Sequence, residues 1–119
     1  MSLYLKLKPE IKEKWVDALR GGYFLQGTGM LAYDDHETSS KRFCCLGVLN
    51  AVCFLGVEED STLLPCITFR EAFTPESISS LPDGDRLTGE LVSLQKQLAG
   101  FNDSGQDFKR IASFIEANL

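Results

Sequence analysis

The segment at residues 44–55 constrains the fold most strongly, because its side chains are apolar almost all the way round. A segment with no polar face has to be enclosed on several sides, whichever regular structure it forms. It is longer than most buried strands, so we expect a central buried helix at residues 44–55. The apolar stretch around it is shorter than the roughly 20 residues that a membrane-spanning helix needs. We therefore expect a core element and no membrane partner.

A first amphipathic helix is expected near the start of the chain. Pro9 fits the first turn of a helix, where its missing N–H costs nothing. Apolar side chains then recur at helical spacing from Ile11 to Leu19, until Gly21 and Gly22 follow. This pattern predicts a helix at residues 9–20 with one packed face and one solvated face.

Two further helices are expected towards the end of the chain. Leucines recur at helical spacing from Leu87 to Leu98, which predicts a helix at residues 86–99 that Gly100 ends. After a polar turn at residues 102–105, Asp107 is a suitable N-cap for a last helix. The short connection favours antiparallel packing of these two helices.

Extended chain is expected in two places. Residues 23–33 are aromatic and aliphatic and contain two glycines, which suits extended chain with a bend, and the polar residues 34–40 are expected to form a loop. The chain then returns through residues 41–44 as the second strand of a hairpin, and residues 66–69 are expected to form a short strand. The length and pattern predict a single α+β domain over residues 1–119, with about four helices and a small antiparallel hairpin or sheet.

Charge and cysteine usage limit the location and the partners. The formal net charge is -5 and the pI is about 4.8, which disfavours nucleic acid as a partner. No apolar stretch followed by a cleavage site opens the sequence, and the four cysteines lie in hydrophobic sequence. We therefore expect reduced thiols and a cytoplasmic location.

Cys44 and Cys45 suggest a nucleophile, because a thiol at the start of a helix can have its pKa lowered by the helix dipole. Cysteine catalysis also needs a base, and the only histidine, His36, lies upstream in the polar loop. We therefore expect packing cysteines and assign no catalytic residue, with Cys44, Cys45 and His36 as the candidates if there is one. Adjacent cysteines rarely point the same way, so no metal site is expected, and no cofactor either.

Two polar and glycine-containing segments are candidates for the lining of a binding pocket. The glycines of the first, Gly27 and Gly29, follow Gln26 and can let a ligand approach backbone amides. The second begins with Asn102 and Asp103, whose side chains are more polar than a turn requires. A helix-capping loop explains the second segment better than a binding site does, so both segments are kept only as candidate lining of a pocket.

Three runs of sequence resemble a family of small proteins of unknown function from phages, prophages and bacteria. They are KWVDALR at residues 14–20, FCCLGVL at residues 43–49 and FNDSGQDFKRIA at residues 101–112. The last run has Phe101 where that family has leucine and Asp107 where it has serine, and both changes keep an apolar anchor and an N-cap. The resemblance implies a phage or mobile-element accessory protein and supplies no activity.

The sequence therefore favours a non-catalytic protein that binds a host protein or a small ligand. A small cysteine-dependent hydrolase or transferase is the first alternative. A structural subunit of a larger assembly is the second, and the sequence leaves a homodimer open.

Overall fold

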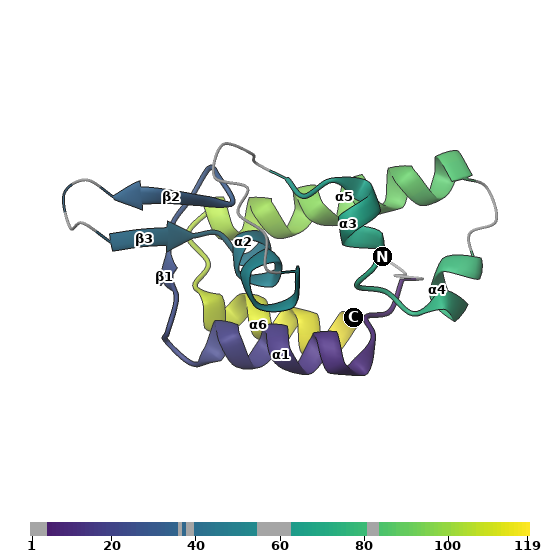
Figure 1. Ribbon diagram of the computed structural model, residues 1–119, viewed down its shortest axis with the longest axis horizontal. Helices are drawn as coiled ribbons and strands as arrows, with labels where there is room; N and C mark the ends of the chain where they lie inside the picture. Colours follow the sequence, from purple (N-terminus) through teal and green to yellow (C-terminus); the bar gives the residue numbers. More distant parts are fainter. Residues whose placement is uncertain (1–4, 36, 38–39, 55–62, 81–83) are drawn as a thin grey trace.

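The computed structural model describes residues 5–35, 37, 40–54, 63–80 and 84–119 (Figure 1). Within these residues there are six α-helices and a small three-stranded sheet that lies at one end of the molecule (Figure 1), so the predicted α+β class is confirmed. The elements, in chain order, are α1 (Pro9–Arg20), β1 (Leu25–Gln26), β2 (Ala32–Asp35), β3 (Ser40–Phe43), α2 (Cys45–Leu49), the π-helical turn η1 (Asn50–Phe54), α3 (Cys66–Arg70), α4 (Pro75–Ser79), α5 (Gly84–Asp103) and α6 (Phe108–Asn118). No helix among the described residues is both long and apolar enough to cross a bilayer.

The predicted central helix is present as α2, which continues into the wider turn η1. All residues of α2 are buried, as the apolar sequence requires, and Leu55 lies outside the described residues. Gly47 lets the helix press directly on the chain before β2, because a Cβ at this position would lie 1.8 Å from the carbonyl oxygen of Leu31. The backbone amide of Cys44 also donates to that carbonyl at 3.1 Å. The glycine and this hydrogen bond together seat α2 against the sheet.

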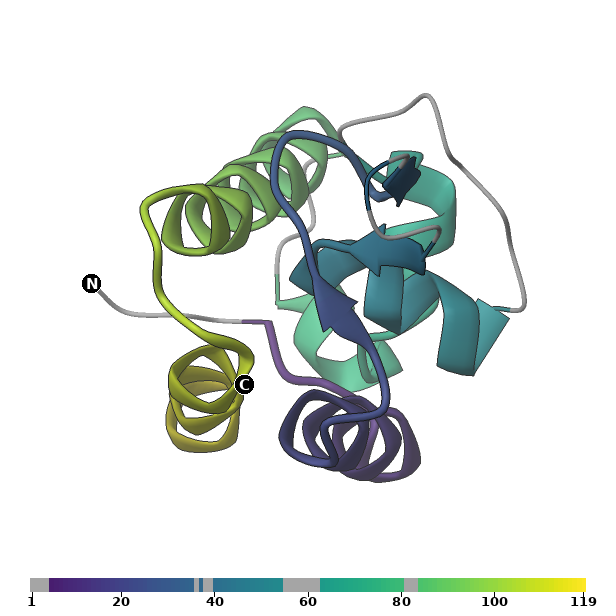
Figure 2. The same ribbon diagram turned by 90° about the vertical axis from the view of Figure 1, so that its left-hand side faces the viewer.

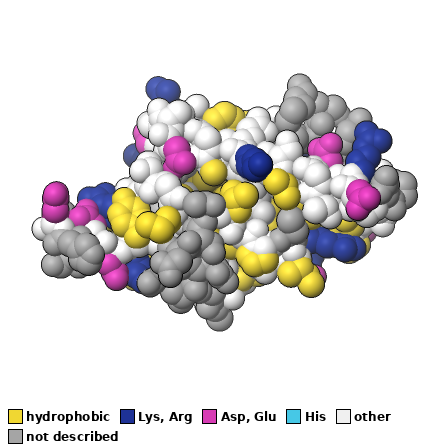
Figure 3. Space-filling model, turned by 90° about the horizontal axis from the view of Figure 1, so that it is seen from above, with side chains coloured by type: hydrophobic (Ala, Val, Ile, Leu, Met, Phe, Trp, Pro, Cys, Tyr) yellow, Lys and Arg dark blue, Asp and Glu magenta, His cyan; other side chains and the backbone are white. Residues whose placement is uncertain are grey.

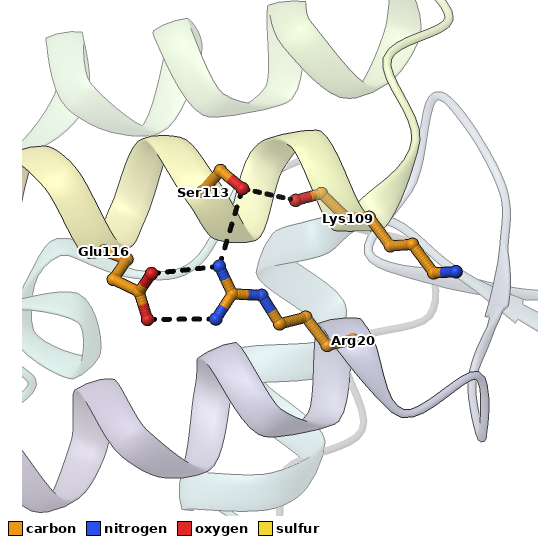
Figure 4. Close-up of polar contacts among 4 residues, drawn as sticks. All are labelled: Arg20, Lys109, Ser113 and Glu116. Carbon is orange, nitrogen blue, oxygen red and sulfur yellow. Dashed lines mark hydrogen bonds and ion pairs between the residues drawn. The ribbon is translucent and has the colours of Figure 1, made fainter.

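Helix α1 has the predicted bounds and lies beside α6 (Figure 2). Its buried side chains are Trp15, Val16 and Leu19, which form the packed face that the spacing indicated. On the surface of this pair the guanidinium of Arg20 donates to both carboxylate oxygens of Glu116, at 2.9 and 3.1 Å (Figure 4). One face of α1 therefore packs and the other stays polar.

Helix α5 runs past Gly100, so the prediction that Gly100 ends it is wrong. The stop is made by Gly105, whose φ of 99° is one that glycine adopts readily. The amide of Gln106 donates to the carbonyl of Phe101 at 3.1 Å, and the amide of Gly105 donates to Asn102 at 3.4 Å, which is the Schellman arrangement. The chain then reverses into α6, which runs antiparallel to α5 as expected (Figure 1).

Asp107 is the N-cap of α6, as predicted, because its carboxylate accepts a hydrogen bond of 2.9 Å from the amide of Arg110. The buried face of α6 consists of Phe108, Ile111, Ala112 and Ile115. This face closes the core against α1.

The predicted hairpin is present as the antiparallel pair β2 and β3, in the register Ala32 to Phe43 and Asp35 to Ser40. Strand β1 adds a third, parallel strand to β3, so the sheet order is β1-β3-β2. The predicted loop at residues 34–40 is therefore shorter than expected, and His36 lies outside the described residues. Arg42 holds the sheet together by donating to Asp35 at 2.7 Å and to the carbonyl of Gln26 at 3.0 Å.

The predicted strand at residues 66–69 is wrong, because these residues belong to helix α3. Pro65 precedes the helix in an extended conformation, and the fully buried ring of Phe69 packs edge-on against Phe73 at 5.0 Å between centroids. A second short helix, α4, follows and was not predicted. Its N-cap is Thr74, whose hydroxyl accepts a hydrogen bond from the amide of Ser77.

Candidate functional site

Gln26 joins the end of β1 to the turn between α5 and α6. Its amide nitrogen donates to Oδ1 of Asn102 at 3.0 Å and to the carbonyl of Gln106 at 2.7 Å. Its amide oxygen accepts from the backbone amide of Phe108 at 3.1 Å. The side chain is half-buried, and all of these partners belong to the protein, so Gln26 fixes the geometry of the turn.

The other four predicted binding residues meet at the same place. The buried amide of Asn102 donates to the carbonyl of Gly27 at 2.6 Å, and Oδ1 of Asp103 accepts from the backbone amide of Gly29 at 3.0 Å. The structure thus brings together two segments that lie far apart in the sequence. Most of their polar groups bond to one another and are therefore not free to bind a ligand. The network fixes the two segments relative to each other.

A cavity of about 320 Å³ lies directly beside this network. It is lined by residues from separate parts of the chain, namely Gly29, Cys44, Leu63, Lys96, Ala99, Gly100 and Asp103. Gly29 and Asp103 are thus the two predicted binding residues that face it, whereas Gln26, Gly27 and Asn102 form the bonded layer behind them. The cavity is partly open to solvent, and we take it as the candidate functional site.

One face of α5 supplies most of the wall. Lys96, Ala99, Gly100 and Asp103 follow one another at helical i, i+3, i+4 and i+7 spacing, so their side chains lie in one row. A Cβ added at Gly100 would have no atom within 4 Å, which shows that the space in front of this row is open. Figure 3 shows the molecule from the side above α5, with hydrophobic side chains gathered over the middle of that face.

The opposite wall contains Leu63, and its position is fixed by a side chain of α5. The fully buried amide of Gln95 accepts from the backbone amide of Leu64 at 2.8 Å and donates to the carbonyl of the same residue at 2.9 Å. This two-point contact imitates the pairing of neighbouring strands. Leu63 is consequently held beside the row of α5 residues.

Cys44 lies at the floor of the cavity, at the N-cap position of α2, with 3% of its surface exposed. Burial raises the pKa of its thiol, and the backbone amides of Gly47 and Leu46 offset part of that effect. Cys45 points into the core, where its thiol lies 3.5 Å from the carbonyl of Leu98. Burial raises the pKa of Cys45 well above its ordinary value. Both thiols are therefore protonated and weakly nucleophilic at neutral pH.

His36, the base of the cysteine hypothesis, lies outside the described residues. A third cysteine, Cys53, is half-buried on η1, and burial raises the pKa of its thiol. No group of three or more His, Cys, Asp or Glu side chains in the described ranges could hold a metal ion.

The sequence signals for the site were partial. Gly29 and Asp103, which the loop composition predicts as binding residues, line the cavity, whereas the lining residues Leu63, Lys96, Ala99 and Gly100 are not among the predicted ones. The signal available for the three residues on α5 was their common row, which mixes small side chains with charged ones. The sequence of α5 alone does not distinguish such a row from an ordinary solvated helix face. The other lining residues of the cavity come from distant parts of the chain, so they give no signal near this row.

The fold and the cavity define a small α+β protein with a ligand-sized cavity beside α5, the longest of the described helices. A family described as Domain of unknown function (DUF8296) matches residues 7–80, more than half of the chain. The chain belongs to this family. No curated protein and no solved structure matches the sequence. The matched residues include Gly29, Cys44 and Leu63 of the cavity, while Lys96 and Asp103 lie beyond them.

Proposed function

We propose that this protein is a non-catalytic binding protein that takes a small ligand into the cavity between α5, Gly29 and Cys44. The observation that carries the proposal is the cavity itself, whose volume of about 320 Å³ is at the lower end of the range of small-molecule sites. Its walls are mostly small or apolar, with one basic and one acidic side chain. This composition is typical of sites that bury a ligand and orient it with a few polar groups.

The state of the thiols supports binding over catalysis. A cysteine nucleophile reacts as the thiolate, and burial opposes formation of the thiolate at both Cys44 and Cys45. The hydrogen bonds of Gln26 and Asn102 support a rigid frame, which is what a preformed binding site requires.

The test is to fill the cavity without disturbing the fold. Gly100→Leu places a side chain in open space on α5 and replaces a poor helix former by a good one. The matched control is Gly89→Leu on the same helix, where an added Cβ also meets no atom within 4 Å. Native mass spectrometry of protein purified from cell extract should find a small molecule on the native protein and on Gly89→Leu, and none on Gly100→Leu.

Two results would contradict the proposal. One is a retained small molecule that stays bound to Gly100→Leu at an unchanged level. The other is the absence of any retained molecule from all three proteins, together with no change in melting temperature across a metabolite collection.

We further propose that the protein acts in the cytoplasm as an accessory factor of a phage or other mobile element. The resemblance of residues 43–49 and 101–112 to phage-encoded proteins supports the origin, and the free thiols of Cys44, Cys45 and Cys53 support a reducing compartment. Its ligand-bound form then engages a host protein. A pull-down from host lysate with and without the cavity filled by Gly100→Leu tests this, and recovery of the same proteins by both forms would contradict the link to the cavity.

A second candidate function is cysteine-dependent transfer to or from a bound ligand, because Cys44 lines the same cavity as Lys96 and Asp103. Iodoacetamide labelling decides between the two. A binding protein should label at Cys44 far more slowly than its unfolded chain, with a rate that is still rising when the pH exceeds the ordinary thiol pKa. Rapid labelling at neutral pH that Cys44→Ser abolishes would favour the enzyme.

The third reading, a structural subunit or homodimer, makes a different prediction. Light scattering would then show a mass that rises with protein concentration. The binding proposal needs no second copy, because the cavity is built within one chain.

A further inference from the structure

The two charged side chains of the cavity stand at opposite ends of its helical wall. Lys96 and Asp103 are about two turns of α5 apart, which puts their Cα atoms roughly 10.5 Å from each other. This separation is too great for the direct ion pairs that form between residues three or four positions apart on a helix. The cavity therefore has a basic end and an acidic end.

Neither charge is neutralised by its own helix. The positions three and four residues from Lys96 are Val92, Ser93, Ala99 and Gly100, and none of them is acidic. The positions that flank Asp103 in the same way are Ala99, Gly100, Gln106 and Asp107, and none of them is basic. Both side chains are thus free of the helical pairs that exposed charges usually form.

Lys96 and Asp103 are both exposed, and neither side chain is fully paired within the described residues. Oδ1 of Asp103 accepts from the backbone amide of Gly29 at 3.0 Å, which fixes the carboxylate at one end while its second oxygen has no partner among the described residues. Lys96 likewise makes no hydrogen bond or ion pair within the part of the chain that the structure describes. The stretch between them consists of Ala99 and the open space at Gly100, with Leu63 opposite.

We infer that the cavity binds a zwitterionic ligand of dipeptide size, with its ammonium group at Asp103 and its carboxylate at Lys96. This inference rests on the proposed binding function and adds the class of ligand. The Cα atoms of Lys96 and Asp103 lie roughly 10.5 Å apart along α5, so a ligand that contacts both side chains needs well-separated charges. An extended dipeptide places its ammonium and carboxylate groups at the two ends of a span of about 7 Å, whereas a single amino acid spans only about half of that. Small apolar side chains of the ligand fit between Ala99 and Leu63.

The experiment measures binding of leucylalanine and three analogues by isothermal titration calorimetry. N-acetylleucylalanine lacks the ammonium group, leucylalaninamide lacks the carboxylate, and leucine is too short to reach both ends. Leucylalanine should bind at least tenfold more tightly than each analogue. Equal binding of leucylalanine and its capped forms, or no binding of leucylalanine up to about 10 mM, would overturn the inference.

Two variants assign the ends. Lys96→Met should remove the preference for leucylalanine over its amide and keep the preference over the acetylated form. Asp103→Asn should remove the preference over the acetylated form and keep the preference over the amide, because it removes the negative charge. The side-chain oxygen of the variant can still accept from the amide of Gly29, so the local structure is kept. Lys109→Met, an exposed change on α6, is the control and should alter neither preference. Unchanged preferences in both cavity variants would also overturn the inference.

The outcomes separate the ligand class from the binding function. If Gly100→Leu removes a retained molecule but leucylalanine does not bind, the class of ligand is wrong and the cavity still binds something else. If no molecule is retained and no probe binds, the binding function fails together with the inference.

Discussion

The indole N–H of Trp15 donates a hydrogen bond of 2.9 Å to the main-chain carbonyl oxygen of Cys45, and both residues are fully buried. This contact joins α1 to the first turn of the central helix α2. A tryptophan N–H in a core needs an acceptor, and here the acceptor belongs to the segment that carries the adjacent cysteines. Trp15 thereby fixes the orientation of α2, and with it the position of Cys44 at the cavity floor.

Trp15→Phe should lower the free energy of unfolding by about 2–4 kcal/mol, because it removes this hydrogen bond and leaves unfilled volume in the core. Denaturant unfolding followed by circular dichroism measures the loss. Tyr23→Phe is the control, since Tyr23 is 87% exposed and its change should stay within about 0.5 kcal/mol. A Trp15→Phe protein as stable as the native one would show that the contact is not stabilising.

Gly47→Ala should destabilise the protein by more than about 3 kcal/mol or prevent folding, because the new Cβ would collide with the backbone carbonyl of Leu31. Neither backbone can move without separating α2 from the chain before β2. Gly89→Ala, on the open face of α5, should instead stabilise the protein by about 0.5–1 kcal/mol. Thermal unfolding of the two variants should therefore shift in opposite directions.

The central apolar segment and helix α1 show what the sequence could predict. The burial of residues 44–50 followed from the apolar composition of this segment, whereas residues 51–54 are only half-buried. The bounds of α1 followed from Pro9, the apolar spacing and the glycines after Arg20. Local sequence and simple physical chemistry were sufficient for both.

The end of α5 and the presence of α3 show where such reasoning fails. Gly100 has the composition of a helix stop, but Asn102 is held in the helix by its hydrogen bond to Gly27, a contact between distant parts of the chain. Residues 66–69 are β-like in composition, and the burial of Phe69 against Phe73 selects a helix instead. Tertiary packing decided both cases.

The candidate site divides in the same way. The turn residues Gly29 and Asp103 were predicted from their chemistry, whereas Lys96 and Gly100 became visible only when the structure placed Cys44 and Leu63 opposite them. Which row of a helix faces a cavity depends on contacts between distant segments, and these do not appear in the local pattern.

Asn102→Asp should lower the free energy of unfolding by about 2–4 kcal/mol at neutral pH. The variant keeps the oxygen that accepts from Gln26, loses the donor to Gly27 and puts a charge in a buried position. Asn118→Asp, where the side chain is only half-buried, is the comparison and should cost less than about 1 kcal/mol. Equal losses in the two variants would show that the network beside the cavity has no special weight.

The ion pair between Arg20 and Glu116 should make a pH-dependent contribution to stability. The hydrogen bond from Arg20, and then its charge, lower the pKa of Glu116 below its ordinary value. A carboxyl whose folded pKa is lowered stabilises the fold above its unfolded pKa, and this contribution disappears as the pH falls through the folded pKa. The stability difference between the native protein and Glu116→Gln should therefore be present at neutral pH and absent in strong acid.

Denaturant unfolding at a series of pH values measures this difference, and added salt should reduce it because the pair is exposed. A difference that stayed constant from neutral pH into acid would mean that packing of the Glu116 side chain, and not its charge, supports the contact between α1 and α6.

The side chain of Gln95 ties α5 to the backbone of Leu64, which precedes α3 in the sequence. The side-chain oxygen of Gln95 accepts a hydrogen bond from the backbone amide of Leu64. The hydrogen exchange rate of that amide proton therefore reports how often the segment containing Leu63 separates from α5. A ligand that fills the hollow should slow this exchange without touching Leu64. The hydrogen bonds between Gln95 and Leu64 thus allow the opening rate of the site to be followed at one backbone amide.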